Sequence, residues 1–516
     1  MRTWPFLEAP LHVTWPTGIH LALFLAFLAL GAASLVYAFA WKAQARPALL
    51  LHVAGGLLTL LAGDLITLLI GWELLSFSAF FLIASGGGTR APRAAWRYLV
   101  FQIVAAAALF AGAAVQADAS GSLAVTVADP AAQPLLLLAI AIKTAVIPLH
   151  GWLVDGYPAA PPALAPLLSV FATKVGVYTA ARLLNLPPVS LLGGLMAVGG
   201  VLGALGQRTG RRLLSYHIVS QVGFMLAGVG LATGAGIAAG TFHAINNLAY
   251  KALLFMVIGA VIRQTGHDRL DGLGGLARQM PFTFAAGVIA SASIAGLPPF
   301  NGFASKELLK SALGEGPVAW LLVAATVGTG LSFIKFIALV FLGRGRAEGI
   351  APPRDPPPGM AVPMALLAAA CLVLGLWPSL AVRGVAHAYY RPAAIGYAVF
   401  PLLGSAALWL AFRVRLAHLR LPAPWPAVRR IARQAARRTR ARARAVHEMG
   451  WQATLAVALA AWLALALLFV GGDEDAPHGD GVHRLDEPLA QGPVLEHPRD
   501  LGQEPDVRAR PRLRRE

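Results

Sequence analysis

The chain has 516 residues, of which 57% are hydrophobic and 13% charged, and its formal net charge is +18. Together with a mean hydropathy of +0.66, this composition excludes a soluble protein and predicts repeated apolar spans of roughly 17–25 residues, as in a helical protein that crosses a membrane many times. The single cysteine excludes a disulfide framework and an all-cysteine iron–sulfur site. The sequence also lacks a glycine-rich nucleotide-binding loop. We therefore expect no cofactor and no redox or hydrolytic centre.

The apolar runs predict an all-α membrane protein with fourteen transmembrane helices. They lie near residues 18–41, 47–63, 65–86, 96–117, 132–149, 159–184, 190–206, 213–233, 236–262, 282–298, 317–342, 361–380, 394–412 and 451–470. The segment before the first helix carries no clear cleavable signal, so we expect it to be retained.

The loops between these helices alternate in charge. Loops after odd-numbered helices hold the basic residues, whereas the loop after the fourth helix, residues 116–132, has two aspartates and no lysine or arginine. Cytoplasmic loops are enriched in Lys and Arg. We therefore predict a multi-pass protein of the bacterial cytoplasmic (inner) membrane, with its N-terminus outside and its odd-numbered loops in the cytoplasm.

The end of the chain differs from the rest. The predicted parts are a transmembrane core at 1–412, an arginine-rich cytoplasmic segment at 413–450, an additional helix at 451–470 and a disordered polar tail at 471–516. The second part has eleven arginines and no acidic residue between Arg413 and Arg444. It indicates a positive-inside loop, or a surface that binds anionic lipids or an acidic partner; we do not expect nucleic acid. With the N-terminus outside and fourteen predicted crossings, the tail is also expected outside the cytoplasm.

Two of the predicted helices are interrupted by proline and glycine, the fifth near Pro148 and the tenth over 296–302. Proline removes a backbone donor and clashes with the preceding turn. Non-helical backbone at membrane depth is tolerated only where protein or a wet cavity receives it. Breaks in corresponding places of two halves are typical of inverted repeats with an ion site between them, so we predict two discontinuous helices and inverted repeats.

Five ionisable residues lie inside runs long enough to cross a bilayer: Glu73, Lys143, Lys174, Lys251 and Lys335. A charge at the bilayer centre costs about 2.5–3.5 kcal/mol even on the lenient scale, so five of them indicate a charge pathway. A lysine holds its proton while a carboxylate is near and releases it when the carboxylate pairs elsewhere. The alternatives are a structural hydrogen bond for the glutamate, and snorkelling to the surface for the last lysine, near a helix end.

Other polar residues extend this pathway. His243, Asn247 and Lys251 are four residues apart and share one face of a helix. His150 follows the first break and is a candidate for the cytoplasmic access route, while His217 is either a water-lined relay or a packing residue. The histidines are too scattered for a metal site, and we predict none. Before the glutamate helix, Asp64 is expected to act as the N-cap.

At these residues the chain resembles the antiporter-like subunits shared by Mrp-type Na⁺/H⁺ antiporters, respiratory complex I (NADH:quinone oxidoreductase) and membrane-bound hydrogenases. The matching motifs stand in family order between about residues 45 and 345. They are Gly-Trp-Glu at 71–73, the Pro-Leu-His-x-Trp-Leu core within 143–155, Ala-Pro-Pro-Ala at 160–163, Thr-Lys-Val-Gly-Val-Tyr at 173–178, and the stretches 215–224, 251–255 and 295–303. The motif at 173–178 looks most like the D-type member of the Mrp subunits.

The resemblance implies a proton-translocating subunit that works inside a larger complex. It implies a glutamate–lysine pair, here Glu73 and Lys143, connecting lysines at Lys174 and Lys251, and a terminal charged residue that maps to Lys335. The chain departs from the family in having fewer helices before the glutamate, an asparagine where relatives often carry a second histidine, and the C-terminal additions.

We therefore expect protons to cross by way of the Glu73–Lys143 pair, Lys174 and the His243/Lys251 face, and to leave near Lys335, with Na⁺ as a candidate for exchange. The expected partners are other membrane subunits. One alternative is a pumping subunit of complex I or a hydrogenase. Another is an energy-coupling subunit of an inorganic-carbon uptake complex. A solute carrier is disfavoured because nothing resembles a site for an organic substrate.

Overall fold

The computed structural model describes residues 11–43, 45–343, 353–382 and 387–418. Within these residues the backbone is helical apart from turns and three isolated antiparallel bridges, which confirms the all-α prediction. The predicted helix at 451–470 and the tail at 471–516 lie outside the described residues, as does most of the arginine-rich segment.

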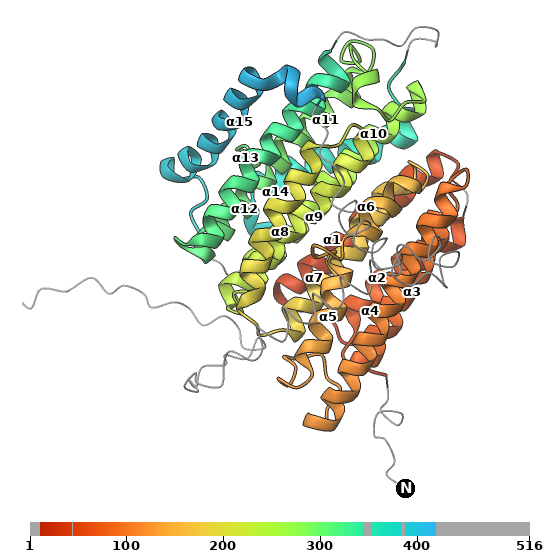
Figure 1. The fold of residues 1–516 in the computed structure, drawn as a ribbon, viewed down its shortest axis with the longest axis vertical. Helices are drawn as coiled ribbons and strands as arrows, with labels where there is room; N and C mark the ends of the chain where they lie inside the picture. Colours follow the sequence, from red (N-terminus) through yellow and green to blue (C-terminus); the bar gives the residue numbers. More distant parts are fainter. Residues whose placement is uncertain (1–10, 44, 344–352, 383–386, 419–516) are drawn as a thin grey trace, which may run out of the picture. The chain divides into compact units, whose positions relative to one another are not determined.

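Fifteen α-helices follow one another along the described residues (Figure 1). They are α1 Gly18–Ala40, α2 Arg46–Leu61, α3 Leu65–Ala84, α4 Arg90–Ser120, α5 Gln133–Lys143, α6 Gly151–Gly156, α7 Ala165–Leu183, α8 Pro188–Leu205, α9 Gly210–Val229, α10 Gly234–Thr265, α11 Pro281–Ala295, α12 Asn301–Leu313, α13 Pro317–Ile337, α14 Pro358–Leu376 and α15 Pro392–His418. Short 3₁₀ turns form η2 Tyr157–Ala159, η3 Leu270–Gly272 and η5 Pro378–Leu380, and a π-helical turn, η4 Ala338–Leu342, extends α13.

Eight of the described helices are long and apolar enough to cross a membrane: α1, α3, α4, α8, α10, α13 with η4, α14 and α15. Three others, α2, α5 and α11, are apolar but shorter. The 11 residues of α5 span only about 16 Å at 1.5 Å per residue. Such a helix reaches the middle of a bilayer and needs a second piece to complete the crossing.

The helix that carries Glu73 has a fixed start. The Asp64 carboxylate accepts hydrogen bonds from the backbone N–H groups of Ile66 and Thr67, both at 2.8 Å, so Asp64 is the N-cap of α3 as predicted. Glu73 follows nine residues later, about 13 Å along the axis. The cap thus sets the depth of the glutamate.

The first predicted break is present, but the helix ends earlier than the sequence indicates. The prediction of helix over 132–149 is wrong beyond Lys143, where α5 stops. A helical Pro148 would clash with the Thr144 carbonyl and leave it unbonded. Turns replace the helix until α6 begins, and the Trp152 indole donates to the Ile142 carbonyl at 2.8 Å. The break therefore leaves Lys143 at the C-terminal end of a half-helix.

The second break separates α11 from α12, a helix that the sequence analysis did not predict. Gly296 takes a left-handed conformation (φ 89°), and its N–H bonds back to the last turn of α11. At Gly302, on the first turn of α12, a Cβ atom would stand 1.7 Å from the Ser293 carbonyl oxygen. Only glycine allows the two half-helices to approach this closely.

Two helix pairs cross at glycines in the same manner. A Cβ atom on Gly55 (α2) would lie 2.9 Å from the Gly71 carbonyl of α3, and one on Gly193 (α8) 2.6 Å from the Gly223 carbonyl of α9. Small residues at such crossings are typical of membrane helix pairs. The order of neighbouring helices also recurs in the two halves. In α2 to α5 and in α8 to α11, each helix packs against the next one along the chain. In both halves the helix after the break, α7 or α13, packs against the broken helix.

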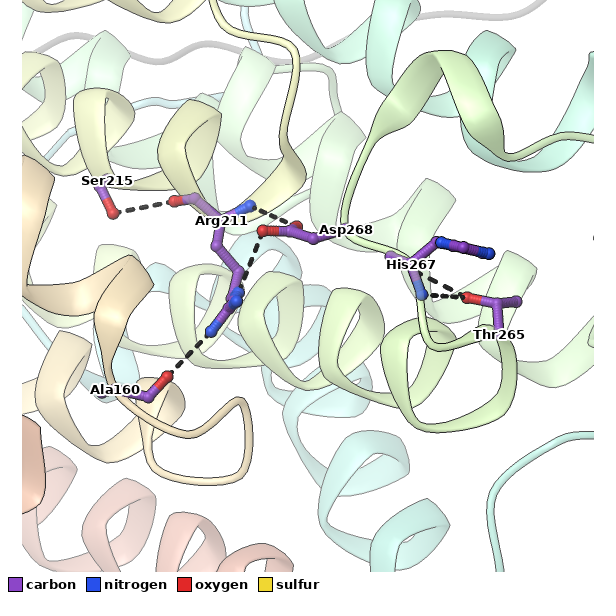
Figure 2. A network of polar contacts seen from close by, with 6 residues as sticks. All are labelled: Ala160, Arg211, Ser215, Thr265, His267 and Asp268. Atoms are coloured by element: carbon purple, nitrogen blue, oxygen red, sulfur yellow. Dashed lines mark hydrogen bonds and ion pairs between the residues drawn. The ribbon is translucent and has the colours of Figure 1, made fainter. Parts of the chain in front are cut away.

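One end of the bundle is held by ion pairs between arginines and aspartates. These pairs are Arg97–Asp155, Arg212–Asp155, Arg211–Asp268, Arg208–Asp271 and Arg269–Asp271. Figure 2 shows Arg211 joined both to Asp268 and to the Ala160 carbonyl. The contacts bring the loops after the third, fifth, seventh and ninth predicted helices to one end, which agrees with the charge pattern. We call it the basic end.

Candidate functional site

Lys143 is the last residue of α5 and is fully buried. Its ammonium donates to Ser76 Oγ at 2.8 Å and Gln102 Oε1 at 3.0 Å, with the Trp72 carbonyl at 3.4 Å. It also lies 4.5 Å from the centroid of the Trp72 ring. These partners use the three protons of the ammonium, and the helix C-terminus favours a cation. All of the partners are neutral.

Glu73 follows Trp72 on α3. Its side chain is partly buried, and Oε1 is fully buried without a hydrogen-bond partner among the described residues. The sequence analysis expected this residue at depth, and it did not foresee the partial exposure. Glu73 and Lys143 interact electrostatically, yet no ion pair within 4 Å joins them. The structure thus shows the pair in its separated arrangement.

Two further lysines continue the row of cations. Lys174 on α7 and Lys251 on α10 are fully buried, and each donates to one backbone carbonyl, of Ser169 at 2.8 Å and of Leu214 at 2.9 Å. The two amines lie within electrostatic range of each other. Against Lys143, α7 packs at Gly176, where a Cβ atom would meet the lysine Cβ at 3.2 Å. Each of these ammonium groups keeps donors free for water.

His243 lies at the centre of a hydrogen-bonded network. Its Nε2 is 3.2 Å from Gln221 Oε1, which also accepts from the Tyr250 hydroxyl at 3.1 Å. Asn247 Nδ2 donates to the same hydroxyl at 3.2 Å. On the other side of the ring, Nδ1 lies 2.9 Å from Ser305 Oγ. The predicted shared face of His243 and Asn247 thus belongs to one network.

Lys306 is the residue that the sequence analysis missed. It follows Ser305 on α12, and its ammonium donates to the carbonyls of Ile294 and Ala295, at 3.0 and 3.1 Å. It thereby caps the last turn of α11. Because Ser305 bonds to His243, the network extends to the residue next to Lys306, which interacts electrostatically with His243. The available signal was the proline break at Pro298 and Pro299, a few residues before it in the sequence.

A cavity of about 60 Å³ opens beside Lys306, lined by side chains of α12, α13 and α15. One water occupies roughly 10–15 Å³ on this scale, so the cavity has room for several. Glu307 and Lys310 also line it. The Glu307 carboxylate accepts from Arg391 at 3.3 Å, and the Lys310 ammonium lies over the ring of Tyr397. Charged groups and water-sized space therefore meet at this end of the row.

Lys335 lies elsewhere. It is buried on α13, and its ammonium donates to the carbonyls of Leu205 and Gln207 at 2.9 and 3.1 Å. These carbonyls belong to the C-terminal end of α8, close to Arg208 of the basic end. The alternative stated from the sequence is snorkelling to the surface, but the residue is only 1% exposed and its ammonium instead caps the end of α8.

The two secondary histidines occupy different environments. His217 on α9 is fully buried, with neither ring nitrogen bonded among the described residues, and it lies within electrostatic range of Lys251 and Lys306. His150 is buried after the first break, with its ring 5.9 Å from that of Tyr216. The first therefore sits in the row of cations and the second near the basic end. No group of His, Cys, Asp and Glu suited to a metal occurs in the described part of the chain.

The chain is similar to membrane proteins of known families. The family model described as NADH:quinone oxidoreductase/Mrp antiporter, transmembrane region, matches residues 62–332. The chain is 32% identical over 302 residues to the D-type Na⁺/H⁺ antiporter subunit of Alkalihalophilus pseudofirmus, a match covering 53% of this chain and 60% of the relative. It is 29% identical over 366 residues to hydrogenase-4 component B of Escherichia coli, covering 62% and 54%. The match thus spans less than two thirds of either relative.

Among solved structures, a chain of the Mrp complex from Dietzia sp. DQ12-45-1b superposes with a TM-score of 0.66 at 26% identity. The superposition covers 79% of this chain and 89% of the other. The likeness therefore extends through nearly all of the helices described above.

Proposed function

We propose a function from one established premise: this chain belongs to the family of transmembrane subunits that NADH:quinone oxidoreductase and Mrp antiporters share, as the match over residues 62–332 shows. The family confirms the resemblance drawn from the motifs and makes the chain a multi-pass membrane protein. We propose that the chain moves protons across the membrane as one subunit of a larger complex, with Na⁺ as the candidate for exchange.

The observation that carries this proposal is the set of fully buried lysines held by neutral groups. Lys143, Lys174 and Lys251 are all 0% exposed, and their hydrogen bonds go only to carbonyl, amide and hydroxyl oxygens. A buried cation without a counter-ion is expensive to keep. Such a group releases its proton readily when a neighbouring site is ready to receive it.

The proposed route begins with an exchange of partners. When the Glu73 carboxylate approaches Lys143, it stabilises the ammonium. When it withdraws to the separated arrangement, the proton is free to pass toward Lys174 and Lys251 through water on their unused donors. His243 and Ser305 line the next part of the route, and water carries the proton past them to Lys306.

We propose Lys306 as the terminal residue of the route, in place of Lys335. Lys306 lies beside Ser305 of the His243 network and faces the water-sized cavity, whereas Lys335 is bonded to the end of α8. The cavity provides the hydration that a proton needs at the end of its path.

We also propose that α2–α7 and α8–α13 are inverted repeats. The recurring glycine crossings, the recurring order of neighbours and the two broken helices support this arrangement. Counting each broken pair once gives thirteen crossings in the described residues, and the predicted helix at 451–470 would be the fourteenth. The basic end is then cytoplasmic, the N-terminus outside, and the membrane the bacterial inner membrane.

Similarity to hydrogenase-4 component B supports a second candidate, a proton-pumping subunit of a respiratory or hydrogenase complex. The proton route is the same in both, and the partner subunits decide between them. Purifying the complex through a tag on this chain identifies those partners: antiporter subunits support exchange, and quinone or iron–sulfur subunits support the pump.

A substitution of the glutamate tests the proposed function. Glu73→Gln keeps the size of the side chain but cannot ionise, so we expect proton flux in vesicles with the whole complex to fall by about 100-fold or more. Glu315→Gln, which alters an exposed glutamate after α12, serves as the control and should retain flux. Equal flux in both variants would exclude the partner exchange.

A further inference from the structure

Two tyrosine hydroxyls lie buried between the basic end and Glu73. Tyr98 on α4 and Tyr157 in η2 are both 0% exposed, and neither hydroxyl has a hydrogen-bond partner within the described residues. Buried hydroxyls in native proteins are nearly always bonded to protein or to water. Two unpartnered hydroxyls near each other therefore indicate a hydrated position.

Buried tyrosines elsewhere in the protein behave differently. The Tyr37 hydroxyl donates to the Met256 carbonyl at 2.9 Å, and the Tyr178 hydroxyl to the Leu60 carbonyl at 3.2 Å. Those two hydroxyls act as ties between helices. Tyr98 and Tyr157 form no such tie, so a structural hydrogen bond does not account for their hydroxyl groups.

The positions of the two tyrosines connect the surface with the glutamate. Tyr98 interacts electrostatically with both Tyr157 and Glu73. The ring of Trp152 packs against both tyrosine rings, with its centroid 5.4 Å from that of Tyr98 and 6.1 Å from that of Tyr157. The Trp152 indole N–H is already bonded to the Ile142 carbonyl, so this ring is held in place and offers no donor to the two hydroxyls.

The surface end of this row lies at the basic end. Arg97, next to Tyr98, is paired with Asp155, two residues before Tyr157, and Arg212 is 3.5 Å from the same carboxylate. These three side chains are 24–27% exposed. Tyr98 is eight residues into α4, about 12 Å from its start. The row thus runs from a solvent-accessible ion pair, past two tyrosines, to the glutamate.

From these contacts we propose that Tyr98 and Tyr157, together with water, relay protons from the basic end to Glu73. The proposal rests on the proposed function and names its access route. At each tyrosine the hydroxyl oxygen gains a proton from water on one side while it gives its own proton to the next acceptor. One O–H bond forms as another breaks, the tyrosine stays neutral, and the last proton binds the Glu73 carboxylate.

Removing each hydroxyl alone tests the relay. Tyr98→Phe and Tyr157→Phe keep the rings and their contacts with Trp152. We expect each to lower proton flux through the whole complex in vesicles by at least about tenfold. This is less than the roughly 100-fold or more typical of a positioned proton-transfer group, because water partly replaces the hydroxyl. Since the two act in series, the double variant should be little slower than the slower single variant.

The matched control is Tyr37→Phe, which removes a hydroxyl that is bonded in the structure and lies off the route. It should keep wild-type flux. In the Tyr98 and Tyr157 variants alone, the ratio of the rate in H₂O to the rate in D₂O should rise, because proton transfer itself has become slower. The melting temperature of the complex should stay the same in these variants. A packing defect would lower the melting temperature and would not slow proton transfer selectively.

The outcomes separate the relay from the proposed function. Wild-type flux in Tyr98→Phe or Tyr157→Phe, with Glu73→Gln still inactive, overturns the tyrosine route and leaves the glutamate exchange standing. A loss of flux that comes with a lower melting temperature and an unchanged isotope ratio also overturns it, in favour of packing. Wild-type flux in Glu73→Gln means that the proposed function itself has failed.

Discussion

The buried lysines of this protein differ in how many of their ammonium protons are used. Lys143 has three neutral acceptors within 3.4 Å, from α3 and α4, whereas Lys174 and Lys251 each donate to a single carbonyl. An ammonium with unused donors in a protein interior needs water to complete its bonding. The ammonium with all of its donors used therefore lies beside Glu73, and those with donors left for water follow along the proposed route.

Two alanine variants test whether Lys306 or Lys335 is the terminal residue of the proposed route. Lys306→Ala removes the ammonium next to the cavity and should nearly abolish proton flux. Lys335→Ala removes bonds to the end of α8, so it should lower the melting temperature of the complex while much of the flux remains. Flux in vesicles and thermal melting of the same preparations check both. The reverse pattern would restore Lys335 as the end of the route.

The site residues that were predicted from sequence share one property. Lys143, Lys174 and Lys251 each interrupt an apolar run, so their cost in a membrane is visible without a structure. Lys306 stands in a polar stretch, where a lysine attracts no notice. The partial exposure of Glu73 depends on how its neighbours pack, which no local pattern encodes.

Among the helices, the breaks were predictable and the second half-helix was not. Proline and glycine mark both interruptions because they change the backbone directly. Helix α12 was missed because Ser305, Lys306, Glu307 and Lys310 make it too polar to resemble a membrane span. It is held inside the bundle by contacts with α10, α11 and α14, which are tertiary and absent from the local sequence.

The glycine crossings give a prediction about stability. In Gly223→Ala the new methyl group would lie 2.6 Å from the Gly193 carbonyl and 2.5 Å from the Ala197 nitrogen. Both are backbone atoms of α8, so the helices must separate, at a cost of about 1–3 kcal/mol. The purified complex should melt at a lower temperature.

The matched control is Gly87→Ala, because a Cβ atom there meets nothing within 4 Å. Its melting temperature should equal that of the wild type. If the Gly223→Ala complex melts at the same temperature as the Gly87→Ala complex, the close crossing of α8 and α9 is not a source of stability.

At the scale of the whole molecule, one ion pair and one hydrogen bond join the two proposed repeats at the basic end. Arg212 of α9 reaches Asp155 of α6, and Arg211 of α9 bonds to the Ala160 carbonyl and to Asp268 (Figure 2). The charge pattern predicts that these loops share one side of the membrane. It does not predict which arginine meets which aspartate, because that follows from how the half-helices fold back.

Proton flux through the whole complex in vesicles, measured with Lys143→Ala, is the sharpest test of the proposed route. We predict no flux above that of protein-free vesicles, with normal insertion of the subunit. Lys143→Arg should fail as well, since a guanidinium does not release its proton at usable pH, and Lys42→Ala, at an exposed lysine after α1, should transport normally. Wild-type flux in Lys143→Ala would contradict the proposed route.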